Sequence, residues 1–193
     1  MTQILIIQGH PDPAGGHLCH ALADAYAAGA RAGGHEVRRV DVAGLDFPLV
    51  RSKAEWDAGL PPPSVAAVQP DLLWADHFVI LYPLWLGCMP AVLKGFLEQV
   101  LRPGFAMERS SPTAWKSRMK GKSARVVITM GMPALAYRWW FGAHSLRCLK
   151  RSILGFVGIS PIRDTLVGMV EGLTEAKRAA ILGRMRGLGV RGV

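Results

Sequence analysis

Residues 76–106, DHFVILYPLWLGCMPAVLKGFLEQVLRPGFA, predict a buried strand, a short apolar loop and a helix. Residues 78–81 form a continuous apolar run without alternation, which is typical of a strand covered on both faces in a parallel sheet. Pro83 has no N–H to donate and ends the strand, while Pro90 suits the first turn of a helix. The apolar residues that follow recur at helical spacing and predict one buried face: Val92, Leu93, Phe96, Leu97, Val100 and Leu101.

The loop between this strand and helix is a candidate ligand site, because open α/β sheets bind ligands at the carboxyl ends of their strands. Its residues, from Pro83 to Met89, are a proline and mostly large apolar groups. They suit a flat, mostly apolar ligand better than a phosphate. The same composition fits a hydrophobic loop that fills a core or an interface, and the residues alone favour neither interpretation.

A second candidate site follows the first apolar run, residues 4–7, which predicts another buried strand. Residues 9–16 have the composition of a loop, and a helix is expected from about His17 until Gly33 and Gly34. The free N–H groups and the dipole at the start of a helix favour an anion, such as a cofactor phosphate. An ordinary strand-to-helix turn is the alternative.

The rest of the chain continues the alternation of strands and helices. Two arginines within residues 36–42 predict an edge strand. Further elements are expected as follows: an irregular excursion at 43–63, a short or broken helix at 64–74 capped by Ser64, a loop over the carboxyl edge at 107–122, a strand at 124–130, an aromatic-rich loop at 131–142, a helix at 143–154, a strand within 162–170 and a helix at 174–188. This order predicts one α/β domain over residues 1–193, with a flavodoxin-like, doubly wound, five-stranded parallel sheet in the order 2-1-3-4-5. The two candidate loops then lie side by side.

Composition narrows the class of protein. The chain has 193 residues, half of them hydrophobic, which is enough for a buried core and argues against disorder. No apolar run reaches the roughly 20 residues of a membrane helix, and the N-terminus lacks the basic region of a signal peptide. The three cysteines are scattered and fit reduced thiols, so we expect a cytoplasmic protein.

Charge is distributed unevenly along the chain. Residues 1–109 carry 8 Lys or Arg and 11 Asp or Glu, whereas residues 110–193 carry 15 and 3. A basic half favours anionic partners such as nucleotide cofactors, nucleic acid or acidic lipid, although a solvated basic surface is an equally good interpretation. No RNA-binding or zinc-finger motif is present, so nucleic acid is not expected. His10, His17 and His20 lack the spacing of a metal site, and no metal is predicted.

With these loops placed, the chain resembles the NAD(P)H:quinone oxidoreductase family of flavodoxin-like flavoproteins, which includes ancillary oxidoreductase subunits of bacterial potassium-efflux systems. The resemblance runs from Ile4 to about Gly172. It rests on Tyr-Pro-Leu-Trp at 82–85, Pro-Ala-Val-Leu-Lys-Gly-Phe at 90–96, Pro-Gly-Phe-Ala at 103–106 and Gly-His-Pro at 9–11.

The resemblance implies a bound FAD or FMN, NAD(P)H as reductant and a set of site residues. His10 with His17, Leu18 and Cys19 would hold the phosphate end of the flavin. Main chain at Pro83, Leu84, Trp85 and Leu86 would line one edge of its ring, and Thr129, Met130, Gly131 and Met132 the other. Tyr137 and His144 match the tyrosine and histidine that the family places beside the flavin to assist hydride transfer. Some positions depart from the family pattern: His17, Leu18 and Cys19 replace Ser-Phe-Asn, and Leu86 replaces an aromatic residue.

The function that this resemblance implies is two-electron reduction of a quinone by ping-pong hydride transfer. A flavin-binding regulatory subunit that docks on a membrane transporter and a flavin electron carrier are the alternatives. The expected partners are a quinone substrate, a second copy in a homodimer and a membrane protein. Trp139, Trp140 and Phe141 would either roof the pocket or form an apolar dimer seam.

Overall fold

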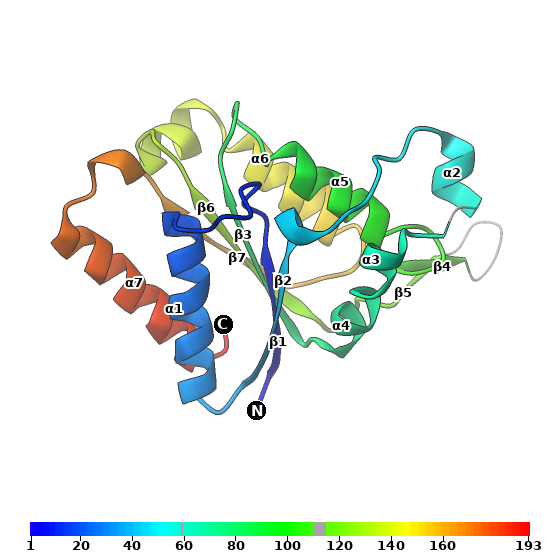
Figure 1. Ribbon diagram of the computed structural model, residues 1–193, viewed down its shortest axis with the longest axis horizontal. Coiled ribbons are helices and arrows are strands. Elements are labelled where there is room, and N and C mark those ends of the chain that lie inside the picture. The colour runs from blue at the N-terminus through cyan, green and yellow to red at the C-terminus, as the bar shows by residue number, and fades with distance from the viewer. Residues whose placement is uncertain (59, 110–114) are drawn as a thin grey trace.

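Five parallel strands form the central sheet, in the order β2-β1-β3-β6-β7 (Figure 1). The computed structural model describes residues 1–58, 60–109 and 115–193. The strands are β1 (Gln3–Gln8), β2 (Glu36–Asp41), β3 (His77–Pro83), β6 (Ser123–Thr129) and β7 (Ile162–Val167). Each neighbouring pair is parallel. Counted along the chain, these strands have the predicted flavodoxin-like order 2-1-3-4-5, with the arginine-bearing β2 at an edge as expected.

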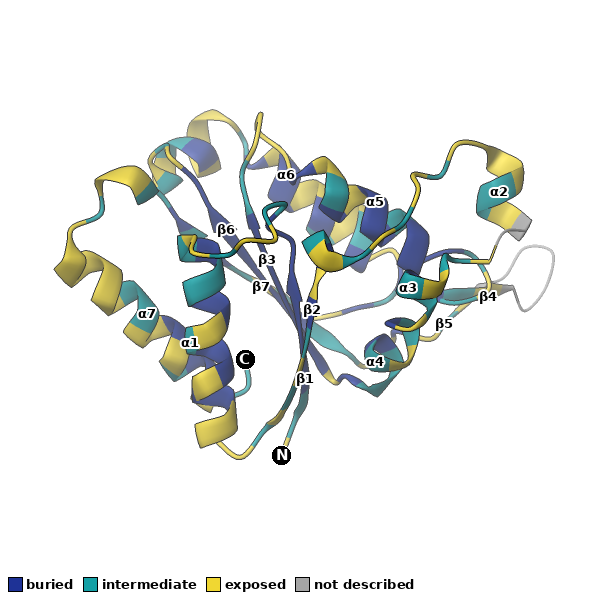
Figure 2. Cartoon of the chain, viewed as in Figure 1, coloured by how far each residue is buried: buried dark blue, intermediate teal, exposed yellow. Residues whose placement is uncertain are grey.

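Helices cover both faces of the sheet (Figures 1 and 2). One face packs against α1 (Leu18–Ala32) and α7 (Glu175–Val190). The other packs against α5 (Ala91–Val100), α6 (His144–Arg147) and its π-helical continuation η3 (Cys148–Leu154), with the short helices α3 (Pro63–Ala66) and α4 (Gln69–Trp74) beside them. The apolar run in β3 divides between the two cores, since Phe78 and Ile80 face α5 while Val79 and Leu81 face α1. Burial on both faces is what the lack of alternation predicted.

The helices α1 and α7 lie very close together because glycines occupy their contact. A Cβ atom at Gly29 would lie 2.0 Å from the carbonyl oxygen of Arg186, and one at Gly189 would lie 2.2 Å from that of Tyr26. Thr174 caps α7, accepting a hydrogen bond from the Lys177 N–H. The predicted glycine end of α1 is confirmed, with Gly33 at its C-cap.

Two sequence predictions before β3 need correction. The segment 43–63 is not wholly irregular, because it contains the 3₁₀ turn η1 (Val42–Gly44) and the helix α2 (Lys53–Ala58). Ser52 Oγ accepts the Glu55 N–H at 3.1 Å, and Glu55 Oε2 accepts the Arg51 N–H at 2.9 Å, much like a capping box. The helix expected at 64–74 is broken before Pro70 as predicted, but Ser64 does not cap it. Its hydroxyl donates instead to the carbonyl of Asp46.

Two further predictions fail after α5. The segment 107–122 was expected over the carboxyl edge of the sheet, but it forms the antiparallel pair β4 (Met107–Arg109) and β5 (Trp115–Ser117) at the opposite edge. Residues 110–114 of that prediction lie outside the described residues. The reason is the direction of α5, which runs antiparallel to the strands and therefore ends near the start of β6. The chain that follows α5 stays at that edge, where the Ser117 hydroxyl donates to the Val157 carbonyl. The expected loop at 131–142 contains a π-helical turn, η2 (Ala136–Trp140), and a 3₁₀ turn, η4 (Val170–Gly172), follows β7.

Within the described ranges, no helix combines the length and the apolar character needed to span a membrane.

Candidate functional site

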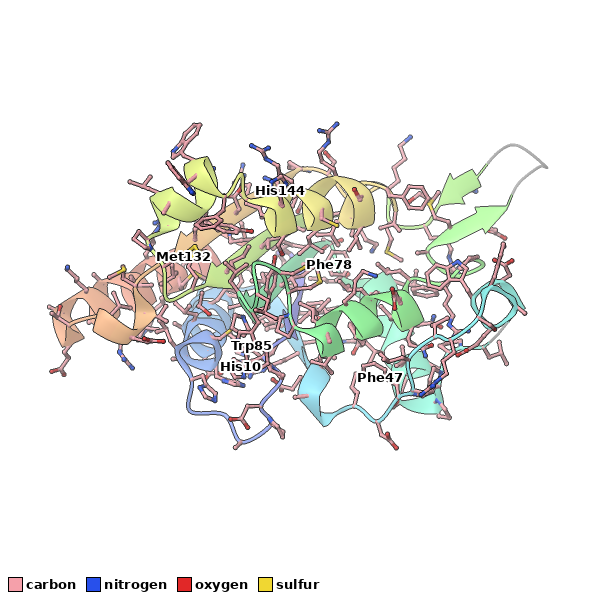
Figure 3. The ribbon with its side chains drawn as sticks, turned by 90° about the horizontal axis from the view of Figure 1, so that it is seen from above. His10, Phe47, Phe78, Trp85, Met132 and His144 are labelled. Carbon is pink, nitrogen blue, oxygen red and sulfur yellow. The ribbon has the colours of Figure 1, made fainter. Side chains whose placement is uncertain are left out.

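The loops after β1, β3 and β6 meet at the carboxyl edge of the sheet. The Gly9 N–H donates to the Leu81 carbonyl at 2.7 Å, and the Leu84 N–H donates to the Thr129 carbonyl at 2.8 Å. The rings of His10 and Trp85 meet edge to face, with centroids 6.4 Å apart. Figure 3 shows these two side chains next to each other. The prediction that the two candidate loops lie side by side is therefore confirmed.

A tight turn shapes the loop after β3. Trp85 and Cys88 exchange two backbone hydrogen bonds, both 2.9 Å long. The two residues between them have positive φ angles, +47° at Leu86 and +75° at Gly87, as in a type I′ hairpin turn. Leu86 is fully exposed and Trp85 half exposed. The turn gives this loop a fixed backbone that presents apolar side chains to the site.

Three histidines gather at the start of α1. The His10 ring stacks on His17, with centroids 4.1 Å apart, and lies 4.9 Å from His20. His17 Nε2 contacts Asp12 Oδ2 at 2.7 Å. The Asp12 N–H donates to His10 Nδ1 at 3.1 Å, so the neutral His10 ring carries its proton on Nε2.

Buried side chains below these histidines hold the loop in place. Gln8, at the end of β1, donates to the Cys19 carbonyl at 3.0 Å and accepts the His10 N–H at 3.1 Å. Sequence reasoning missed Gln8, although a polar residue ending an apolar strand is the signal that marks it. The Cys19 thiol donates to Gln8 Oε1 at 3.2 Å, and burial raises its pKa to about 12. Cys19 is therefore an inert thiol that offers the site only its backbone.

Two of the three histidines, His10 and His20, are uncharged near neutral pH. Burial, followed by the nearby His17 and His20, lowers the pKa of His10 to about 4. Burial also lowers the pKa of His20, with Arg39 adding to the effect. His10 and His20 consequently act as neutral hydrogen-bonding groups at pH 7 rather than as cations.

A polar cavity of about 380 Å³ opens beside these groups, and it suits the anionic end of a cofactor. Its lining includes Gln8, His10, Gly15, Gly16, His20 and Arg39. No side chain caps α1, so the N–H groups of Leu18 and Cys19 lack a capping partner. His20 Nδ1 is buried and has no hydrogen-bond partner among the described residues. Three acids, Asp12, Asp24 and Asp41, also line the cavity. Arg39 pairs with both Asp24 and Asp41, at 2.5 and 2.7 Å, and so offsets one of their two negative charges.

An apolar cavity of about 300 Å³ lies between the loops after β3 and β6. It is lined by Leu86, Gly87, Met132, Tyr137, Phe141 and His144. Before Met132 in the chain, Thr129 and Met130 are buried, and the Met130 N–H donates to the Val167 carbonyl at 2.9 Å. Gly131 is exposed at the end of the strand. Of the residues expected at the two edges of a planar ring, Leu86 and Met132 line this cavity. Figure 3 labels Met132 and His144 on the loops after β6 and Trp85 on the loop after β3.

Tyr137 and His144 differ in their surroundings within this cavity. Tyr137 is 2% exposed, and its hydroxyl oxygen accepts the Leu146 N–H at 3.1 Å. Burial raises the pKa of Tyr137, so it stays protonated. His144 is exposed and begins α6, directly after two residues in the left-handed region, Gly142 and Ala143. The structure brings both side chains to one pocket, and their catalytic role stays a prediction.

A family model described as flavodoxin-like fold matches residues 2–187. The chain belongs to the flavodoxin-like fold family. Among solved structures of this family, an NAD(P)H:quinone oxidoreductase from Methanothermobacter marburgensis superimposes with a TM-score of 0.83, at 23% identity, covering 100% of this chain and 99% of that one. This likeness establishes the fold.

Two relatives of this flavodoxin-like chain are named as oxidoreductases, and a third is named as a potassium-efflux ancillary protein. An uncharacterized NAD(P)H oxidoreductase of Haemophilus influenzae is 29% identical over 64% of this chain and 61% of its own length. An FMN-dependent NADH:quinone oxidoreductase of Ruegeria pomeroyi is 25% identical over 73% and 82%. The glutathione-regulated potassium-efflux system ancillary protein KefG of Escherichia coli O6:K15:H31 is 42% identical over 35% of each chain. The match covers less than two thirds of the first relative's length. The resemblance to quinone oxidoreductases and to potassium-efflux ancillary proteins is confirmed.

Proposed function

We propose that this protein is a flavin-dependent NAD(P)H:quinone oxidoreductase that transfers two electrons in a ping-pong cycle. The observation that carries the proposal is the presence of a polar cavity and an apolar cavity at the carboxyl edge of the sheet, on loops that meet where the rings of His10 and Trp85 contact each other. A bound FAD or FMN would take a hydride from NAD(P)H and pass two electrons to the quinone. The similarity to an FMN-dependent NADH:quinone oxidoreductase supports this chemistry.

The start of α1 would bind the phosphate end of the cofactor. The N–H groups of Leu18 and Cys19 and the α1 dipole favour an anion there. His10 Nε2–H and the partnerless His20 Nδ1 would add two neutral side-chain contacts. His17, paired with Asp12, positions the His10 ring by stacking.

The two walls of the apolar cavity would orient the ring and exclude water. Leu86 and Gly87 from one loop and Met132 from the other line this cavity, and the main chain from Thr129 to Met132 would line the second edge of the ring. The hydrogen bond between the Leu84 N–H and the Thr129 carbonyl fixes the spacing of these walls. Such positioning is what the protein contributes to cofactor chemistry.

Tyr137 and His144 would manage the proton. The Leu146 N–H occupies one lone pair of the Tyr137 hydroxyl, so its O–H remains a donor toward a neighbouring acceptor. The exposed His144 imidazole would exchange a proton between the cavity and solvent, a task that suits a histidine near neutral pH.

The proposal extends to partners. A second copy would pack against the exposed Phe156 and the groove formed by Leu97, Leu101 and Ile153. A cytoplasmic location fits the three free thiols, Cys19, Cys88 and Cys148. Similarity to KefG favours one second function, a flavin-binding regulatory subunit that docks on a membrane transporter.

Spectroscopy of the purified protein tests the proposal. We expect flavin absorbance that NADPH or NADH bleaches and a quinone restores. Flavin that neither nicotinamide reduces would reject the enzyme in favour of a carrier. Protein that binds neither FAD nor FMN would reject both. Recovery of a transporter in a pulldown from membranes, with no quinone reduction, would favour the regulatory subunit.

A further inference from the structure

A cluster of exposed apolar side chains adjoins the apolar cavity, and one of them, Phe141, also lines it. Trp139 and Trp140, in the helical turn η2, are 78% and 85% exposed. Leu135 and Phe141 flank them and are also exposed. Four large exposed apolar side chains within seven residues are unusual on a surface that faces only water. We name these four side chains the aromatic patch.

The part of the chain that carries the aromatic patch is basic. From residue 135 to residue 164 the chain carries five Lys or Arg and one Asp, a balance of +4. Arg138 and Lys150 both pair with that one acid, Asp164. Arg147 and Arg151 lie one helical turn apart, are exposed, and form no ion pair with the described residues. The segment 136–154 runs along one side of the molecule, away from α1 (Figure 3).

We propose that the aromatic patch and its neighbouring arginines dock this protein on an anionic phospholipid bilayer. Tryptophan favours the bilayer interface, where its ring contacts apolar chains and its N–H stays hydrated. Arginines beside it are attracted by anionic headgroups. Phe141 belongs both to the patch and to the lining of the apolar cavity, so docking would turn the mouth of that cavity toward the lipid.

Charge argues against a second copy as the occupant. In a two-fold dimer through this patch, each surface would meet itself. Arg147 and Arg151 would then need acids of the same patch opposite them, and the one acid of the segment 135–164 is already paired within its own chain. A bilayer containing phosphatidylglycerol supplies the opposite charge instead.

Co-sedimentation of the full chain with vesicles tests the proposal. We expect binding to phosphatidylcholine vesicles that contain about 30 mol% phosphatidylglycerol and little binding to pure phosphatidylcholine, with the difference lost at roughly 1 M salt. Trp139→Ala with Trp140→Ala should weaken binding by about tenfold or more. Arg147→Ala with Arg151→Ala should weaken it by roughly fivefold per removed cation.

A matched control separates the patch from net charge. Arg178→Ala with Arg184→Ala removes two exposed cations from α7, which packs on α1 at the other face of the sheet. We expect this control to bind nearly as well as the natural protein. An equal loss in the control, or no binding of the natural protein to either vesicle, would overturn the proposal.

Two further measurements distinguish contact with lipid from contact between two copies of the chain. Brominated phosphatidylglycerol should quench tryptophan fluorescence in the natural protein, and much less in the Trp139→Ala, Trp140→Ala protein. Sedimentation equilibrium without vesicles should give both proteins the same mass. If the double substitution converts a dimer to a monomer, the patch is a seam between copies and the lipid proposal is wrong. Vesicle binding requires no turnover, so its outcome is independent of the proposed enzymatic activity.

Discussion

Replacing Tyr137 with phenylalanine removes one oxygen atom from the apolar cavity and keeps the ring. That oxygen accepts the Leu146 N–H at 3.1 Å near the start of α6, and Tyr137 is 2% exposed. The substitution leaves the N–H without its partner, which costs about 1–3 kcal/mol. For a chain of this size, each kcal/mol lowers the Tm by roughly 2–4 °C.

The same substitution should slow reduction of the flavin. Loss of a positioned proton donor typically lowers a rate by about 10²–10⁴-fold, so we expect a decrease within or somewhat below that range. Rapid mixing with NADPH, followed at the flavin absorbance, measures the rate. Combining Tyr137→Phe with His144→Ala should slow reduction further without releasing the flavin.

Tyr26→Phe is the matched control. Tyr26 is fully buried on α1, and its hydroxyl donates to the Val193 carbonyl at 3.4 Å. We expect a small loss of stability and an unchanged rate. If Tyr137→Phe also leaves the rate unchanged, or if the control slows reduction equally, the role assigned to Tyr137 is refuted.

Three other predictions concern packing, pH and the polar cavity. Gly29→Ala should destabilise the fold by about 1–3 kcal/mol or more in urea unfolding, because the added Cβ would lie 2.0 Å from the backbone of Arg186. Gly183→Ala in α7 is the control; a Cβ there meets no atom within 4 Å, so the change should stabilise the fold by up to about 1 kcal/mol. Similar effects at both sites would contradict the packing of α1 on α7. Burial lowers the folded-state pKa of His77 to about 4, so the unfolded chain binds more protons than the folded one between about pH 4 and 6.5. The stability of the fold should therefore fall as pH falls through that window. His77→Gln should flatten this decline in thermal unfolding, and an unchanged slope would argue against the role of His77. His20→Ala should weaken binding of FMN or FAD by about tenfold in a fluorescence titration, whereas an unchanged affinity would remove its partnerless Nδ1 from the site.

The strand order and the two loops could be predicted because they depend on local patterns. Continuous apolar runs identified β1 and β3, and arginines placed β2 at an edge. Parallel topology then fixed which loops meet. The helix α2 was missed although its signal, Ser52 followed three residues later by Glu55, was present.

Other features of the site depend on tertiary contacts that a sequence does not display. Only Gly87 hints at the type I′ turn, because Leu86 rarely takes a positive φ angle. The buried hydrogen bonds of Gln8 and Tyr137 join residues whose pairing follows from packing. Leu86, Met132, Tyr137 and His144 entered the prediction through family resemblance, and the structure brings them to one cavity.

Titration of the purified, cofactor-free protein with FMN and with FAD tests the central claim most directly. The account predicts that one flavin binds per chain, with an affinity in the micromolar range or tighter. It also predicts that Trp85→Ala weakens this binding, because the Trp85 ring contacts His10 of the polar cavity and precedes Leu86 of the apolar one. Absence of saturable binding for both flavins would contradict the account.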